Sequence, residues 1–192
     1  VDVDAVGAAL ARLHALQPDR RLPRIDGHDA WSAAVEAAEA VAVLVPALGK
    51  RACRLAHRLG RALAALPPAA RVVHGDFSPD QVVLTDNGVA IIDFDSAAVA
   101  DPALDLGSFA ADLDRAELEH RLPVGRAATA AAELVDGYHR AGGAPVDHGV
   151  AAHRAAALLR LAVLPFRERQ PEWPVAIEAI LAGAEAVAAE SR

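Results

Sequence analysis

The sequence predicts an α+β domain that is mostly α-helical, on the basis of three observations. Apolar residues make up 54% of the 192 residues and recur at helical spacing over most of the chain. The stretch 71–95 instead carries short apolar runs typical of β-strands, two of them joined by Asp86-Asn87-Gly88. The length is that of one ordinary domain, so we expect residues 1–192 to form a single domain.

Capping and stop signals delimit three helices in the first third of the chain. The first predicted helix covers 2–16, with Asp2 or Asp4 as its N-cap. Asp29 is the expected cap of a second helix over 30–45. A third helix over 47–66 is expected to stop at Pro67-Pro68.

A short β-rich stretch follows, and then helices resume. "RVVHGD", "QVVLT" and "VAIIDF" are the predicted β segments, the last two forming a hairpin. The later helices are predicted over 104–118, 124–141, 148–168 and 174–190. Gly142-Gly143 should end the second of these, and Pro165 should end or kink the third.

Composition excludes several classes of protein. A formal net charge of −7 argues against non-specific binding to nucleic acid. No apolar run is long enough to cross a bilayer, so we expect no membrane partner. Cys53 is the single cysteine, which rules out an intramolecular disulfide and fits a reducing cytoplasm.

Acidic and other polar residues occur at unusual density around the hairpin, in "HGDFSPDQVVLTDNGVAIIDFD". Asp76 follows the first β segment and Asp93 ends the hairpin; if the hairpin pairs with "RVVH", their carboxylates can approach each other. The oxygens of Asp93 and Gln81 are hard ligands of the kind that Mg²⁺ prefers. Asp76 would then be free to accept or orient a proton. These groups together suit phosphoryl transfer, in which positioning and charge neutralisation supply most of the catalysis.

A purely structural interpretation treats these acids as turn formers. It fits Asp86 in the hairpin turn and Asp80 after a proline. It fits Asp76 and Asp93 less well, because both adjoin apolar strands, where an unpaired carboxylate is costly. We therefore favour a functional interpretation for that pair.

The motifs "HGDFSPDQ" and "IIDFD" together resemble the catalytic core of the aminoglycoside phosphotransferase and choline kinase superfamily, small-molecule relatives of protein kinases. Gln81 follows Asp76 at the spacing of the kinase catalytic Asp and Asn, and 93–95 occupies the place of the D-F-G motif. "DPALDLGSF" and "LARLHAL" resemble further segments of the same family. The resemblance implies the C-terminal lobe of a protein-kinase-like fold, helical with a small β-hairpin carrying the catalytic loop.

The same resemblance implies roles for individual residues. Asp76 would be the catalytic base, or would orient the acceptor hydroxyl. Gln81 and Asp93 would bind Mg²⁺ and thereby ATP. Structural support would come from three residues: His74, Asp95 and Asp105. Of these, His74 would tie the loop to the backbone near Asp93, and Asp105 would brace the loop.

The sequence departs from the family pattern in three ways. Gln81 replaces the usual Asn, and Asp95 replaces the Gly of D-F-G. No glycine-rich phosphate loop precedes His74, and Lys50 lies in an arginine-rich helical segment instead of on a strand. We therefore expect the N-terminal, ATP-clamping lobe to be absent from this chain, and the exposed face to be covered by that lobe or by another chain.

Two functional hypotheses follow. The first is the catalytic and acceptor-binding lobe of an ATP- and Mg²⁺-dependent phosphotransferase acting on a hydroxyl of a small molecule: aminoglycoside-like, choline-like or a sugar. Asp112, Asp114 and Glu117 could attract an ammonium group, although a solvated helix face is their simpler interpretation. The alternative is a non-catalytic kinase-like binding module. A metal-dependent phosphohydrolase is disfavoured because no nucleophile is evident.

Overall fold

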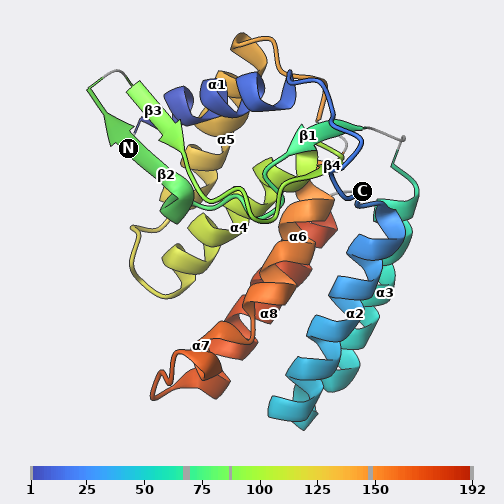
Figure 1. The fold of residues 1–192 in the computed structure, drawn as a ribbon. Coiled ribbons are helices and arrows are strands. Elements are labelled where there is room, and N and C mark those ends of the chain that lie inside the picture. Colours follow the sequence, from blue (N-terminus) through green and yellow to red (C-terminus); the bar gives the residue numbers. More distant parts are fainter. Residues whose placement is uncertain (1, 67–69, 87, 147–148, 191–192) are drawn as a thin grey trace.

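The architecture is that of α-helices packed around one central helix, with two short β-ladders on one side (Figure 1). This computed structural model describes residues 2–66, 70–86, 88–146 and 149–190. The helices are α1 (Val3–His14), α2 (Gly27–Leu44), α3 (Gly49–Ala64), α4 (Ala103–Leu118), α5 (Arg126–Arg140), α6 (Val150–Leu161), α7 (Leu164–Arg167) and α8 (Trp173–Glu190). The strands are β1 (Arg71–Val73), β2 (Val82–Thr85), β3 (Gly88–Ile91) and β4 (Ala98–Ala100), and the 3-10 turns are η1 (Pro46–Leu48) and η2 (Pro79–Gln81). The predicted mostly helical α+β class is confirmed.

Two groups of helices lie on either side of α4. On one side α2, α3, α6 and α8 pack together and share one apolar core, built largely from alanine and leucine (Figure 1). On the other side α1 and α5 pack against each other and share a second core with the β2–β3 hairpin. α4 contributes Ala111 to the first core and Leu106 and Phe109 to the second. It is thus the element through which the two cores are connected.

Glycines allow α1 and α5 to cross at very short distance. A Cβ atom at Gly7 would lie 2.1 Å from the carbonyl oxygen of Leu134, and one at Gly137 would lie 2.2 Å from that of Asp4. Since backbone atoms cannot move aside as side-chain ends can, neither position has room for a methyl group. The crossing matters for the site because α1 carries His14 and α5 carries Tyr138, described below.

The β structure differs from the expected arrangement. β2 and β3 form the predicted antiparallel hairpin, in which Val82 faces Ile91. β1 pairs antiparallel with β4 and not with the hairpin, so the pairing considered above is wrong. β4 is a buried three-residue strand, too short for its apolar pattern to be distinguished from the start of a helix. Asn87 of the hairpin turn lies outside the described residues; Gly88 has a positive φ of 119°.

Helix boundaries agree with prediction within a few residues, with two corrections. Asp26, not Asp29, is the N-cap of α2; Asp29 occupies the third helical position and completes a capping box with Asp26. The predicted helix over 148–168 is broken into α6 and α7, because Pro165 begins a new helical turn. Asp2 caps α1, and Gly142, with a φ of 85°, follows α5 as expected. Pro67, Pro68 and residue 148 lie outside the described residues.

Among the described residues, no helix combines the length and the apolar character needed to cross a lipid bilayer.

Substituting Gly137 with alanine tests the close helix crossing. The alanine favours an isolated helix by about 1 kcal/mol, but its Cβ would collide with the Asp4 carbonyl. We expect Gly137→Ala to lower the free energy of unfolding by about 2–4 kcal/mol, measured by urea denaturation.

Gly183→Ala in α8 is the matched control, because its Cβ would meet only the end of the Leu118 side chain, at 3.1 Å. This variant should be as stable as the wild type or slightly more stable. Equal stability of the two variants would show that the α1–α5 crossing is looser than described.

Candidate active site

The carboxylate of Asp105, in the first turn of α4, holds the start of the predicted catalytic loop. The side chain is fully buried, and its two oxygens accept hydrogen bonds from the backbone N–H groups of His74 (2.6 Å) and Gly75 (2.9 Å). His14 Nε2, from α1, lies 3.0 Å from the same carboxylate. A buried carboxylate is tolerated only with such partners, so loop and helices are ordered together.

The His14 ring continues this network to α5. His14 Nδ1 lies 3.0 Å from the hydroxyl of Tyr138, which accepts a hydrogen bond from the Ala144 N–H (3.3 Å). Burial, together with the carboxylates of Asp105 and Asp101, raises the pKa of Tyr138 to about 12. The phenol therefore keeps its proton and can donate it to the His14 ring, while His14 donates through Nε2 to Asp105.

The loop residues on either side of Asp76 explain why its carboxylate is exposed. Gly75 has a φ of 86°, and a Cβ there would lie 2.1 Å from the Ser96 carbonyl oxygen, so only glycine fits. Phe77 is fully buried and stacks on Phe109 of α4, with ring centroids 5.3 Å apart. Asp76 lies between these two anchored residues and faces solvent.

Backbone contacts bring the loop next to the end of β3. His74 Nε2 lies 2.8 Å from the carbonyl oxygen of Ile92, and the His74 ring packs on Phe94 at 5.1 Å between centroids. The N–H of Ile92 donates to the carbonyl oxygen of Gln81 (3.0 Å). Asp93, the next residue, is exposed and has a φ of 63°, a left-handed conformation that costs about 1 kcal/mol or more for a non-glycine residue.

The structure therefore brings the backbones of the predicted site residues to one place, although they come from different segments. His74 and Asp105 are buried, Gln81 is half-buried, and Asp76 and Asp93 are exposed. Asp95 is also exposed, in the turn that the Ala97 N–H closes on the Phe94 carbonyl at 3.0 Å.

Asp112 joins this site, and the sequence interpretation did not commit to it. Burial, assisted by the carboxylates of Asp76 and Asp80 and opposed by Arg115 and Arg160, raises the pKa of Asp112 to about 6. Asp112 lies two helical turns after Asp105, and hence on the same face of α4. The spacing between Asp105 and Asp112 is the sequence signal that could have assigned Asp112 to the site. It becomes informative only once Asp105 is known to face the loop.

Asp114 and Glu117, considered together with Asp112 for a solvated face or an ammonium site, have structural partners. Arg154 Nε donates to Asp114 at 2.6 Å, in a half-buried ion pair between α4 and α6. Glu117 accepts the N–H groups of Gly125 (2.9 Å) and Ala127 (2.8 Å) and so caps α5. Asp114 is therefore held in a half-buried ion pair, whereas Glu117 is a helix cap that stays partly exposed.

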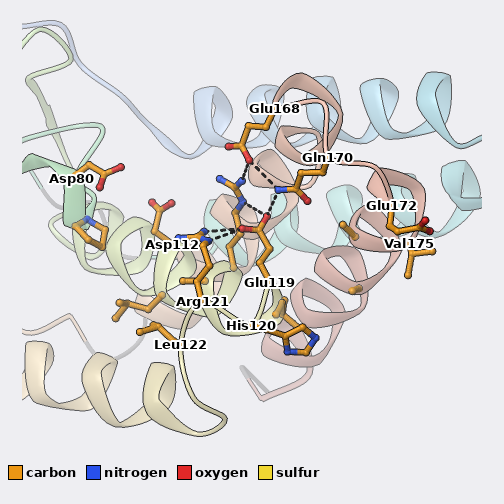
Figure 2. Close-up of a pocket in the computed structure, with 17 residues that line it drawn as sticks. Asp80, Asp112, Glu119, His120, Arg121, Leu122, Glu168, Gln170, Glu172 and Val175 are labelled. Atoms are coloured by element: carbon orange, nitrogen blue, oxygen red, sulfur yellow. Dashed lines mark hydrogen bonds and ion pairs between the residues drawn. The ribbon is translucent and has the colours of Figure 1, made fainter.

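A cavity of about 830 Å³ opens beside the loop, between the second half of α4 and the α7–α8 region. Figure 2 shows Asp80 and Asp112 at one end of it. Its middle carries a polar network in which Glu119 accepts from Arg115 Nε (2.8 Å) and Gln170 Nε2 (3.1 Å). These groups satisfy one another, whereas the carboxylates of Asp80 and Asp112 lie at the end near the predicted catalytic loop and that of Glu172 lies toward the opposite end (Figure 2).

Within the described ranges, no group of three or more His, Cys, Asp or Glu residues is placed to hold a metal ion. The backbones of Gln81 and Asp93 lie close together, because the N–H of Ile92 donates to the carbonyl oxygen of Gln81. Mg²⁺ commonly takes only one or two protein oxygens and fills its other positions with phosphate oxygens and water.

Comparison with known proteins agrees with this geometry. Residues 2–159 match the model of the phosphotransferase enzyme family. The chain belongs to this family, as the motifs around Asp76 and Asp93 had led us to expect. A search of curated protein sequences found no match.

Solved structures share the fold. A glucosamine kinase superposes with a TM-score of 0.71 at 23% identity, over 99% of this chain and 53% of that one. A choline/ethanolamine kinase family protein from Mesorhizobium loti gives 0.66 at 19% identity, over 96% and 61%. A macrolide 2'-phosphotransferase type I gives 0.58 at 24% identity, over 94% and 58%. The chain thus spans only about half to three fifths of their length. Another structure of glucosamine kinase contains glucosamine, ADP and inorganic phosphate.

The raised pKa of Asp112 predicts a specific pH dependence of stability. Its folded pKa of about 6 lies above the usual aspartate value of 3.8, so the folded protein binds the proton more tightly than the unfolded chain does. Ionisation of Asp112 therefore destabilises the fold as pH rises through this range. We expect Asp112→Asn to raise the free energy of unfolding by about 1–3 kcal/mol at pH 8, with the gain vanishing near pH 4.

Urea denaturation at a series of pH values measures this effect. Asp114→Asn, on the same helix, should instead lower stability at pH 8 because it loses the ion pair with Arg154. A gain for Asp112→Asn that is the same at pH 4 and pH 8 would exclude Asp112 ionisation as its cause.

Proposed function

We propose that residues 1–192 form the catalytic and acceptor-binding lobe of an ATP- and Mg²⁺-dependent phosphotransferase that phosphorylates a hydroxyl group of a small molecule. The observation that carries the proposal is the loop braced by Asp105, which exposes Asp76 beside Ile92 and Asp93. Membership in the phosphotransferase enzyme family supports it. Nucleotide and small-molecule ligands in structures of similar fold point the same way.

Asp76 is the proposed catalytic residue. The acceptor hydroxyl would lie against its carboxylate, and the hydroxyl oxygen would attack the γ-phosphorus of ATP. The bond from the γ-phosphorus to the bridging oxygen breaks, ADP leaves, and the hydroxyl proton passes to Asp76. Asp105 would act only by positioning, since it holds the two backbone N–H groups that precede Asp76.

Asp93 and Gln81 are the proposed Mg²⁺ ligands. A Mg²⁺ ion bound there would neutralise charge on the ATP phosphates. The left-handed backbone at Asp93 supports a functional role, because strained residues concentrate at sites where geometry must be held. Gln81 would serve in place of the family's Asn through its side-chain carbonyl oxygen, and Asp95 would add a carboxylate near the nucleotide.

The proposal includes a partner for the open face of the site. Four large apolar side chains on the hairpin and the following turn are exposed: Val83 at 40%, Leu84 at 58%, Ile92 at 45% and Phe94 at 46%. We infer that an ATP-clamping lobe, from elsewhere in the protein or from another chain, covers them. The solved structures that are about twice as long support this inference. Because ATP is abundant in the cytoplasm and Cys53 is a free thiol, we place the protein there.

A non-catalytic binding module is the second candidate. Gln81 and Asp95, where the kinase motifs have Asn and Gly, are the observation that favours it. It predicts nucleotide or acceptor binding without turnover.

Substituting Asp76 tests the proposed function in the protein that includes the ATP-clamping lobe. Asp76→Asn removes the proton acceptor and keeps the side-chain size, so kcat should fall by about 10²–10⁴-fold. Nucleotide consumption with a panel of hydroxyl acceptors measures it. Asp86→Asn, an exposed turn residue of the hairpin, is the control and should retain full activity. An Asp76→Asn enzyme with a near wild-type rate would refute the assignment.

A further inference from the structure

A buried chain of hydrogen bonds runs from α5 through α1 to the start of the predicted catalytic loop. Its members are Tyr138 on α5, His14 on α1 and Asp105 on α4, and we call it the Tyr138–His14–Asp105 relay. The phenol oxygen lies 3.0 Å from His14 Nδ1, and His14 Nε2 lies 3.0 Å from Asp105 Oδ2. All three residues are buried, so each depends on its neighbour in the relay for hydrogen bonds.

The donor and the acceptor of each bond follow from the groups at the two ends of the relay. The Ala144 N–H, which can only donate, lies 3.3 Å from the Tyr138 oxygen. The phenol therefore accepts this bond, and among the described residues His14 Nδ1 is the partner that remains for its own proton. Burial keeps the proton on the phenol, because it raises the pKa of Tyr138 to about 12. A neutral imidazole that accepts at Nδ1 carries its proton on Nε2, which faces Asp105.

Tyr138 thereby selects the tautomer of His14 that donates to Asp105. In the opposite tautomer, the Nε2 lone pair would face Oδ2 of Asp105, and two acceptors would repel each other. Oδ2 also accepts the His74 N–H at 2.6 Å, while Oδ1 accepts the Gly75 N–H at 2.9 Å. Rotation of the carboxylate away from His14 would therefore weaken its bonds to both backbone groups of the loop.

Packing holds the phenol ring of Tyr138 in a fixed place. The backbone of Gly143 lies against the ring, so that a Cβ atom at Gly143 would lie 2.3 Å from Cε1 of Tyr138. A Cβ atom at Gly7 of α1 would lie 2.7 Å from the Tyr138 backbone nitrogen. The His14 ring meets the phenol edge to face, with centroids 5.4 Å apart. The hydroxyl is thus a fixed point from which the orientation of the imidazole is set.

The same part of the molecule anchors the loop on both sides of Asp76. Asp105 holds the two residues before it through their N–H groups. Phe77, the residue after it, is buried in the apolar core that also contains Tyr138. A displacement of about 1 Å at a reacting group can lower a rate by about 100-fold, so a smaller movement of the loop is enough to change kcat.

We propose that Tyr138 and His14 are positioning residues for the proposed phosphoryl transfer, which hold the Asp105 carboxylate in one orientation and thereby keep Asp76 where it meets the acceptor hydroxyl. The inference rests on the proposed function, which makes Asp76 the reacting carboxylate. Tyr138 and His14 are buried away from solvent and do not touch substrate. Their contribution is therefore to the rate of the chemical step and not to the binding of nucleotide or acceptor.

Hydrogen exchange of the 192-residue chain, followed by NMR, tests the relay without any turnover. Tyr138→Phe removes the hydroxyl and keeps the ring, and we expect exchange of the His74 and Gly75 N–H groups to become about 5- to 20-fold faster. The reference is the Val45 N–H, which donates to the Val41 carbonyl oxygen at 2.8 Å and lies outside the relay. Its exchange rate should change much less. Equal changes at all three N–H groups, or no change, would overturn the proposal.

Steady-state kinetics of the protein that includes the ATP-clamping lobe tests the effect on catalysis. Tyr138→Phe should lower kcat by about 3- to 10-fold while the KM values for nucleotide and acceptor stay unchanged. Val41→Ala is the control, because it removes two methyl groups from the other apolar core and so lowers stability without touching the relay. It should keep the wild-type kcat. In a His14→Leu background, Tyr138→Phe should lower kcat by less than about 2-fold, because the hydroxyl acts through the imidazole.

Three kinetic outcomes would overturn the positioning role. They are a wild-type kcat in Tyr138→Phe, an equal loss of kcat in Val41→Ala, and losses that multiply in the Tyr138→Phe/His14→Leu double variant. If His14→Leu does not fold, hydrogen exchange and kcat of Tyr138→Phe still decide the question. The two proposals fail separately: faster exchange in a protein that phosphorylates no acceptor refutes the function only. An active enzyme in which Tyr138→Phe changes neither exchange nor kcat refutes the positioning role only.

Discussion

The buried carboxylate of Asp105 is the interaction on which the candidate site depends. It joins three parts of the chain that are distant in sequence: α4, the catalytic loop through the N–H groups of His74 and Gly75, and α1 through His14. A carboxylate removed from water stabilises the fold only when such donors surround it, so the arrangement forms as a unit or not at all. Phe77 and Gly75 hold the backbone on either side of Asp76, and the Asp76 side chain is exposed to solvent.

α4 combines stability and function on a single helix. Its apolar side connects the two cores, and its last turns are tied to neighbouring helices through Asp114, Glu117 and the bond from Arg115 to Glu168. The face toward the loop carries Asp105, Ser108 and Asp112, of which the last two are poorly satisfied. The burial of these polar groups on one face is unfavourable, and the fold tolerates it because the rest of the helix is well packed. Such locally unfavourable burial is typical of functional sites.

Much of the fold and part of the candidate site could be predicted from the sequence. Helical periodicity, the Asp2 cap, the turn before Gly88 and the glycines after α5 are local signals, so they identified helices and hairpin within a few residues. β4 was missed because a three-residue strand is defined by its partner β1 and not by its own pattern. Asp112 was not assigned, because an acid on a helix looks the same in sequence whether it faces water or another carboxylate.

The sequence by itself determined the order of the main helices and the hairpin, the family and the candidate residues Asp76, Gln81 and Asp93, because these depend on residue type and spacing along the chain. Only the tertiary structure decided which buried polar groups find partners. It showed that Asp105, His14 and Tyr138 form one network, that Asp114 and Glu117 are structural, and that Ser108 Oγ and His153 Nε2 lack a hydrogen-bond partner among the described residues. The reason is physical: hydrogen bonding and desolvation depend on distances between segments, which helix packing sets and no local pattern encodes.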